Sequence, residues 1–160
     1  MSQPRGPGLT HVRADGSAHM VDVSAKDVTA RTASAAGRVL LSRDAVAALR
    51  GGTVPKGDAL AVARIAGIQA AKRTPELVPL AHPIGVHGVE VDLDVVDEGV
   101  EIRAVVRTAD RTGIEMEALT AVAVAALALI DMVKAVDKHA RITDVRVTAK
   151  SGGRSGDWSE

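Results

Sequence analysis

The sequence predicts an α+β fold in which helices cover one face of an antiparallel sheet. Two patterns carry this prediction. In residues 89–96 and 100–106, apolar and polar side chains alternate as in strands with one buried face, and an Asp-Glu-Gly turn separates the two runs. Residues 114–139 form a long stretch whose apolar residues recur at helical spacing. A sheet on one side and helices on the other would bury both apolar faces.

The sequence predicts little regular structure at the start of the chain. Residues 1–8 are rich in proline and glycine and are expected to be a flexible lead-in. Residues 20–24 are a candidate for a short strand. Residues 31–41 are expected to be extended, although their pattern is weak.

Two helices are expected before the hairpin. Ser42 is placed to cap a short helix over residues 43–49, which a pair of glycines would close. A second helix follows Asp58 and ends near Lys72, with many small residues along it and positive charge at its C-terminus.

The remaining segments complete the pattern. Residues 74–83 contain three prolines and are expected to form a loop. Residues 144–148 are predicted to be the last strand, and residues 151–160 a flexible tail. The order of elements fits the βαββαβ pattern of ferredoxin-like folds with extra N-terminal structure, in a single domain spanning residues 1–160.

Composition excludes several classes of protein. Lys plus Arg and Asp plus Glu both number 20, so no net field favours nucleic acid or an anionic membrane. The chain has no cysteine, which excludes disulfides, thiolate catalysis and Cys-ligated metals. Neither an apolar signal segment at the start nor an apolar run of roughly 20 residues is seen. We therefore expect a cytoplasmic protein that binds neither nucleic acid nor membranes. The core must be built from Ala, Val, Leu and Ile, because Phe and Tyr are absent.

The long helix carries the most informative polar residues. At about 100° per residue, Glu117, Asp131, Lys134 and Lys138 share one face. Asp131 and Lys134 are neighbours in space, and periodicity alone favours a solvated salt bridge. The alternative is a carboxylate and an amine that adjust each other's pKa for proton transfer. Glu117 lies roughly 21 Å from Asp131 along the axis. A small ligand could contact both only at a subunit junction.

Three other segments are candidates for binding residues. Lys56 stands before a helix N-terminus, which suits a phosphate but equally an ordinary cap. His82 lies in a proline-stiffened loop, where a histidine can bind or transfer protons or simply be exposed. Lys150 precedes a basic Gly/Ser segment that could wrap a phosphate or be a plain tail. His87 is not at a metal-ligand spacing from His82, so no metal site is expected.

Together these segments resemble the MoaC family of cyclic pyranopterin monophosphate synthases, which act in molybdenum cofactor biosynthesis. The likeness covers nearly all of residues 9–158. It rests on four stretches: LTHVRADGSAHMVDVSAK, KGDALAVARIAGIQAAKRTPELVPLAHPI, TGIEMEALTAVAVAALALIDMVKAV and AKSGGRSGDW.

The resemblance implies an enzyme that acts as a phosphorus–oxygen lyase. Its substrate would be the cyclic dihydro-GTP intermediate, and its products cyclic pyranopterin monophosphate and diphosphate. The family subunit is ferredoxin-like and assembles into a homohexamer, a trimer of dimers with active sites at subunit interfaces. No cofactor is required, although Mg²⁺ could accompany the triphosphate.

Site residues follow from the resemblance position by position. The catalytic residues would be Asp131, Lys134 and Lys56, with the acid and base of each step left open. Ala81 stands where relatives often have cysteine, and Arg154 where they often have lysine. The substrate-binding residues would be Leu80, Ala81, His82, Met116, Glu117, Lys150, Lys26 and Arg31.

Two other functions stay open, a nucleotide-binding regulatory module without chemistry and a purely structural oligomer.

Overall fold

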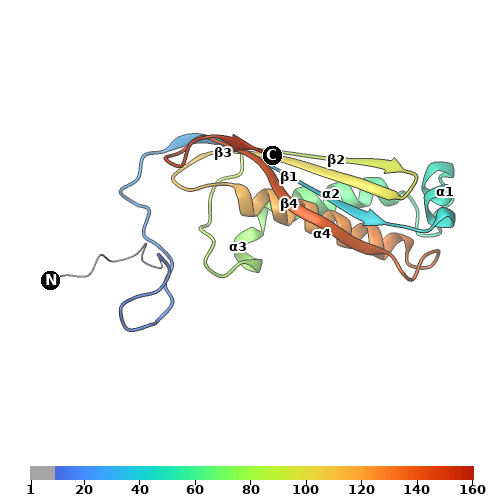
Figure 1. Cartoon of the computed structure of the whole chain (residues 1–160), viewed down its shortest axis with the longest axis horizontal. Coiled ribbons are helices and arrows are strands. Elements are labelled where there is room, and N and C mark those ends of the chain that lie inside the picture. Colours follow the sequence, from blue (N-terminus) through green and yellow to red (C-terminus); the bar gives the residue numbers. More distant parts are fainter. Residues whose placement is uncertain (1–9) are drawn as a thin grey trace.

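A computed structural model describes residues 10–160, which form one antiparallel sheet with helices packed on one of its faces (Figure 1). The strand order is β2-β3-β1-β4-β5, and every neighbouring pair is antiparallel. Helices α2 and α4 pack on each other, and α4 lies against β1, β3 and β4. The elements are β1 Thr29–Leu40, α1 Arg43–Gly51, α2 Ala59–Lys72, α3 Thr74–Leu77, β2 Gly88–Val96, β3 Gly99–Asp110, α4 Glu115–Val133, β4 Arg141–Ser151 and β5 Trp158–Ser159.

This order confirms the α+β, ferredoxin-like prediction. Strand β1, helix α2, the β2–β3 hairpin, helix α4 and strand β4 follow one another as the βαββαβ pattern requires. The hairpin alternates as expected, since Val91 and Leu93 are buried while Glu90 and Asp92 are exposed. Gly99 closes the hairpin with φ at 149°, and a Cβ there would lie 1.9 Å from the Val39 carbonyl oxygen. Only glycine allows the turn to pass so close to β1.

The two long helices meet through small side chains. A Cβ built on Gly67 of α2 would lie 2.8 Å from the Ala121 carbonyl oxygen and 3.1 Å from the Ala125 Cβ of α4. Ala63 and Ala118, on the same two helices, are also fully buried. In a chain without Phe or Tyr, small side chains can fill the space between two helices only when the helices approach this closely.

Side-chain caps fix the starts of α1 and α2, and the Ser42 cap and glycine end of α1 are as the sequence predicts. The Ser42 hydroxyl accepts from the Ala45 backbone N–H, and Gly52 ends α1 in the left-handed region. The Asp58 carboxylate accepts from the Ala61 N–H at the start of α2. Asp137 is buried and accepts from the backbone N–H of Ser42 at 2.7 Å, which ties the end of β1 to the turn after α4.

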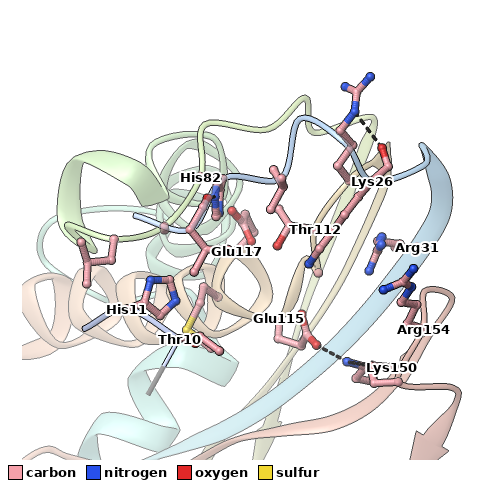
Figure 2. Close-up of a pocket in the computed structure, with 18 residues that line it drawn as sticks. Thr10, His11, Lys26, Arg31, His82, Thr112, Glu115, Glu117, Lys150 and Arg154 are labelled. Carbon is pink, nitrogen blue, oxygen red and sulfur yellow. Dashed lines mark hydrogen bonds and ion pairs between the residues drawn. The ribbon is translucent and has the colours of Figure 1, made fainter. Parts of the chain in front are cut away.

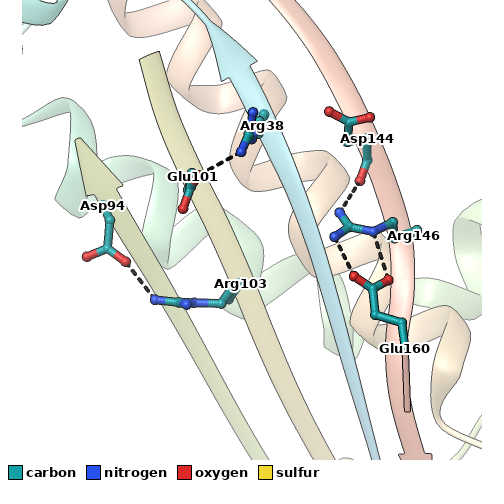
Figure 3. Close-up of polar contacts among 7 residues, drawn as sticks. All are labelled: Arg38, Asp94, Glu101, Arg103, Asp144, Arg146 and Glu160. Atoms are coloured by element: carbon teal, nitrogen blue, oxygen red, sulfur yellow. Dashed lines mark hydrogen bonds and ion pairs between the residues drawn. The ribbon is translucent and has the colours of Figure 1, made fainter. Parts of the chain in front are cut away.

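The sheet face opposite the helices is polar (Figure 3). Ion pairs cross between neighbouring strands on it, among them Arg103–Asp94 at 2.8 Å and Arg38–Glu101 at 3.0 Å. Each exposed pair adds little to stability. Their alternating charges keep this face hydrophilic, which explains why the hairpin carries its acidic and basic residues at every second position.

Four segments have a different structure from the one that the sequence predicts. Residues 20–24 form no strand, and Val21 and Val23 instead line a pocket. Residues 74–83 were expected to be loop only, but they begin with α3, whose Pro75 sits in the first turn where proline is tolerated. Helix α4 ends at Val133 rather than at residue 139, and β4 is longer than predicted at both ends.

The sequence predicts that both ends of the chain are flexible. The predicted lead-in, residues 1–8, lies outside the described residues. In the predicted tail, Ser151 is the last residue of β4, and Trp158–Ser159 form β5, which pairs with β4 at the edge of the sheet.

Helix α4 is long and apolar enough to cross a membrane by length and composition alone. Half of that apolar window is buried inside the molecule, against the sheet and α2. A core helix of a globular domain meets the same criterion for this reason, so α4 is a weak indication of a membrane span.

Gly67→Ala should destabilise the protein, although alanine is the better helix former by about 1 kcal/mol. The added methyl group would meet the Ala121 carbonyl oxygen, so α2 and α4 must move apart. We expect the free energy of unfolding to fall by about 1–3 kcal/mol in denaturant titrations at fixed protein concentration.

Gly51→Ala is the matched control for this change. Gly51 is the exposed last residue of α1, and a Cβ there would meet only Thr53 side-chain atoms at 3.9 Å. Its stability should stay the same or rise slightly. A Gly67→Ala variant as stable as the unchanged chain would contradict the close helix contact.

Candidate active site

One end of the sheet gathers the functional residues, because the strand register brings distant segments together. Thr29 at the start of β1 pairs with Asp110 at the end of β3, and Ala33 pairs with Lys150 near the end of β4. Helix α4 begins at Glu115, five residues after Asp110, so its N-terminus lies at the same end.

A pocket of about 520 Å³ opens at this end (Figure 2). Its walls are the N-terminal segment, β1, the loop after α3, the first turn of α4 and the end of β4. Every residue predicted to bind substrate lines this pocket, although the predicted contacts with a ligand stay predictions. They are Lys26, Arg31, Leu80, Ala81, His82, Met116, Glu117 and Lys150.

The loop that carries His82 is held to β3 by polar contacts. The Thr108 hydroxyl, in a buried side chain, donates to the Gly85 carbonyl oxygen. The Gly85 N–H donates to Asp110 Oδ2 at 3.3 Å, and the His87 N–H donates to the Arg107 carbonyl oxygen at 2.9 Å. These bonds position the loop against the rigid sheet.

Cations occupy one end of the pocket. Figure 2 shows Lys26, Arg31, Lys150 and Arg154 gathered there, away from His82 and Glu117. The arrangement needs glycine in the C-terminal turn. Gly153 has φ at 83°, and a Cβ there would lie 2.3 Å from Arg31 Nη1. The Gly-Gly of the SGG motif therefore brings the turn directly onto the guanidinium.

Glu115 lies between the two ends of the pocket. Its Oε1 is 2.6 Å from Lys150 Nζ, with both side chains largely buried. Burial works to raise the pKa of Glu115, but the hydrogen bond from Lys150 and the charges of Lys150 and Arg31 outweigh it and lower that pKa. A carboxylate thus balances part of the basic end.

The opposite end of the pocket holds a carboxyl group, that of Glu117, whose pKa is shifted in the other direction. Glu117 is only 3% exposed, and it forms no ion pair within residues 10–160. Burial raises its pKa to about 7, and the nearby Glu115 charge adds to the rise. A carboxyl with such a pKa can hold or release a proton near neutral pH, as a general acid or base must.

His82 stands beside this group (Figure 2). Its Nε2 is hydrogen-bonded to the carbonyl oxygen of Val21 in the N-terminal segment. A carbonyl only accepts, so Nε2 carries the hydrogen, and in the neutral ring Nδ1 is the acceptor.

The predicted catalytic residues form a separate cluster. Asp131 Oδ1 lies 2.7 Å from Lys134 Nζ, and its Oδ2 lies 3.0 Å from Lys56 Nζ. All three side chains are about half exposed, and none lines the pocket. Hydrogen bonds from Lys134, and then from Lys56, lower the pKa of Asp131. Sequence spacing predicted the Asp131–Lys134 contact but gave no sign that Lys56 joins it.

The prediction that Glu117 shares an exposed polar face with Asp131 is wrong. The two positions differ by only about 40° around the helix, yet Glu117 is buried and Asp131 is exposed. The N-terminal segment and the loop after α3 line the pocket around Glu117, whereas Asp131 near the last turn meets the side chain of Lys56 and stays about half exposed. Lys138 lies beyond the helix, in the turn that follows Val133.

Several pocket residues had no role in the sequence prediction. His11 and Thr10 come from the N-terminal segment, and Glu115 comes from the start of α4. Arg111 and Thr112 lie between β3 and α4. Four of these five residues lie in irregular segments, and Glu115 lies in the first turn of α4, so none stands in a spacing that indicates chemistry.

Comparison with known proteins shows which family the chain is similar to. The MoaC family matches residues 20–153. A cyclic pyranopterin monophosphate synthase of Streptomyces avermitilis is 68% identical over 156 residues, covering 98% of this chain and 92% of that protein. The one of Streptomyces griseus is 69% identical over 150 residues, covering 94% and 85%. Cyclic pyranopterin monophosphate synthase 2 of Mycobacterium bovis is 55% identical over 158 residues, covering 99% and 95%.

The buried carboxyl of Glu117 should make stability depend on pH. Unfolding returns its pKa from about 7 to the usual 4.5, so the free energy of unfolding falls as the pH rises between these values. Relative to the unchanged chain, Glu117→Gln should gain stability over this range, by up to about 3 kcal/mol. Unfolding titrations at several pH values and fixed protein concentration measure the difference.

Asp131→Asn provides a contrast of opposite sign. The folded-state pKa of Asp131 is lowered, so ionised Asp131 contributes to stability above the usual value of 3.8, and this contribution is lost as the pH falls below it.

For Glu117, a stability difference between Glu117→Gln and the unchanged chain that stays constant from pH 4.5 to 7 would show that Glu117 is ionised in the folded protein.

Proposed function

The chain belongs to the MoaC family, and we propose that its pocket binds the cyclic dihydro-GTP intermediate. The protein is a lyase of molybdenum cofactor biosynthesis, a cyclic pyranopterin monophosphate synthase. The observation that supports this substrate best is the polarity of the pocket, which has cations at one end and a protonatable carboxyl at the other.

This polarity suggests the orientation of the substrate. A triphosphate leaves water only where positive donors replace its hydration, which Lys26, Arg31 and Lys150 offer at the basic end. The ring system would then lie at the end formed by Glu117 and His82. Among the described residues that line the pocket there is no Phe, Tyr or Trp, so apolar contact with the rings would come from residues such as Met116.

The reaction places two demands on the site. A ribose hydroxyl attacks the innermost phosphorus, a new P–O bond forms, and the P–O bond to the leaving diphosphate breaks. The hydroxyl proton must pass to a base, and the charge growing on diphosphate must be stabilised. Clustered Lys and Arg serve the second demand. Proton carriers for the hydroxyl and for the ring rearrangement are Glu117 and the Lys56–Asp131–Lys134 cluster.

That cluster cannot reach the pocket of its own chain. Asp131 lies at the far end of α4 from Glu117, roughly 21 Å along the axis. The helix surface beside Asp131 and Lys134 is apolar, and Leu127 there is 60% exposed. Exposed apolar residues around a charged cluster are typical of an interface. We therefore propose that the cluster of one subunit completes the pocket of its neighbour in a homohexamer built as a trimer of dimers.

No resident cofactor forms part of this proposal. Mg²⁺ entering with the substrate would be held mainly by phosphate oxygens. The site of action is expected to be the cytoplasm.

Asp131→Asn and Lys134→Ala should each lower turnover by at least about 10²-fold, the usual effect of losing a general acid or base. Folding should be retained because neither side chain belongs to the core, and the oligomer should be retained because the apolar surface beside the cluster is unchanged. The assay is release of diphosphate from cyclic dihydro-GTP. Asp97→Asn removes an exposed ion pair with Arg50 that belongs to neither the pocket nor the cluster, so this control should keep full turnover. Near-normal turnover of Asp131→Asn would reduce the cluster to a solvated salt bridge.

Subunit complementation tests whether the site is shared. Lys150→Ala disables the pocket and Asp131→Asn disables the cluster, so each variant alone should be nearly inactive. Co-expressed, they should regain about one quarter of full activity, because one site in four combines an intact pocket with an intact neighbouring cluster. Mixed oligomers without such recovery would mean that each chain builds its site alone.

A further inference from the structure

The N-terminal segment presents a second imidazole to the pocket. His11 lines it together with His82 and Glu117, and Figure 2 shows these three residues away from the cations. The segment holds His11 in a small hairpin. The His19 N–H donates to the His11 carbonyl oxygen at 3.0 Å, and Val12 forms a bridge with Ala18.

The His11 ring itself is oriented by a hydrogen bond. Its Nδ1 lies 3.2 Å from the His19 carbonyl oxygen. A carbonyl oxygen only accepts, so Nδ1 carries the hydrogen, and Nε2 of the neutral ring has a free lone pair. This is the opposite tautomer to that of His82, whose Nε2 carries the hydrogen. The same kind of backbone contact thus leaves a different acceptor nitrogen on each histidine.

We propose that His11 is a further substrate-binding residue, whose Nε2 accepts a hydrogen bond from an N–H of the guanine-derived rings. Such rings carry N–H donors at their edge and need acceptors once they leave water. The residue is pre-oriented by its hairpin, which reduces the entropy lost on binding. This inference rests on the proposed function, since it needs the rings at the Glu117 end.

Two substitutions separate the two ring nitrogens. In His11→Asn, the amide nitrogen can take the place of Nδ1 and keep the bond to the His19 carbonyl, while the acceptor at Nε2 is lost. In His11→Gln, the longer side chain can return an acceptor near the Nε2 position. The pair therefore distinguishes loss of the acceptor from loss of the hairpin.

Two ligands separate the two ends of the pocket. Calorimetry with GTP probes rings and phosphates together, and inorganic triphosphate probes the basic end alone. His11→Asn should bind GTP about fivefold to tenfold more weakly and bind triphosphate as the unchanged protein does. His11→Gln should recover most of the GTP affinity, and Lys150→Ala should weaken binding of both ligands.

Unchanged GTP affinity in His11→Asn would overturn the inference, as would an equal loss for GTP and triphosphate, which would mean a general disturbance of the segment. If the unchanged protein still releases diphosphate from cyclic dihydro-GTP, the proposed function survives either result. An unchanged protein that neither binds GTP nor releases diphosphate would overturn the proposed function and this inference with it.

Discussion

The rigidity of α4 is the constraint on which the site depends. One continuous helix carries Glu117 in its first turn and Asp131 near its last, so the distance between these carboxyl groups is set by the helix rise and cannot close. The helix in turn is fixed by its packing against the sheet and by the close contact at Gly67 of α2. The pocket and the Asp131 cluster therefore cannot form one site within a single chain.

The same helix shows how burial, more than residue type, sets protonation. Glu117 and Asp131 are both acidic and nearly aligned around the axis. Covering segments remove Glu117 from water and give it no cation, so its pKa rises. Asp131 is open to water and held by two lysines, so its pKa falls. One helix thus carries a carboxyl group that can be protonated near neutral pH at one end and a carboxylate held by two lysines at the other.

Irregular segments supply much of the pocket, and the sheet holds them in place. The loop bearing His82 is tied to β3 through Thr108 and Asp110, and the C-terminal turn rests on Arg31 of β1. The N-terminal segment is fixed by fewer bonds, from His82 to the Val21 carbonyl and from Arg111 to the Lys26 carbonyl. Binding residues on loops above a rigid scaffold combine accurate placement with room for a ligand to enter.

The sequence by itself determined the elements whose signals are local. Alternation fixed the β2–β3 hairpin, Ser42 and Asp58 fixed the starts of α1 and α2, and three-residue spacing fixed the Asp131–Lys134 contact. The resemblance to the MoaC family indicated the activity and the eight predicted substrate-binding residues that line one pocket, whereas the three predicted catalytic residues lie outside that pocket. Tertiary structure alone decided the burial of Glu117, the arrival of Lys56 beside Asp131 and the position of His11. These features depend on which segments cover each end of α4 and on contacts between residues far apart in the chain, and no local periodicity encodes either.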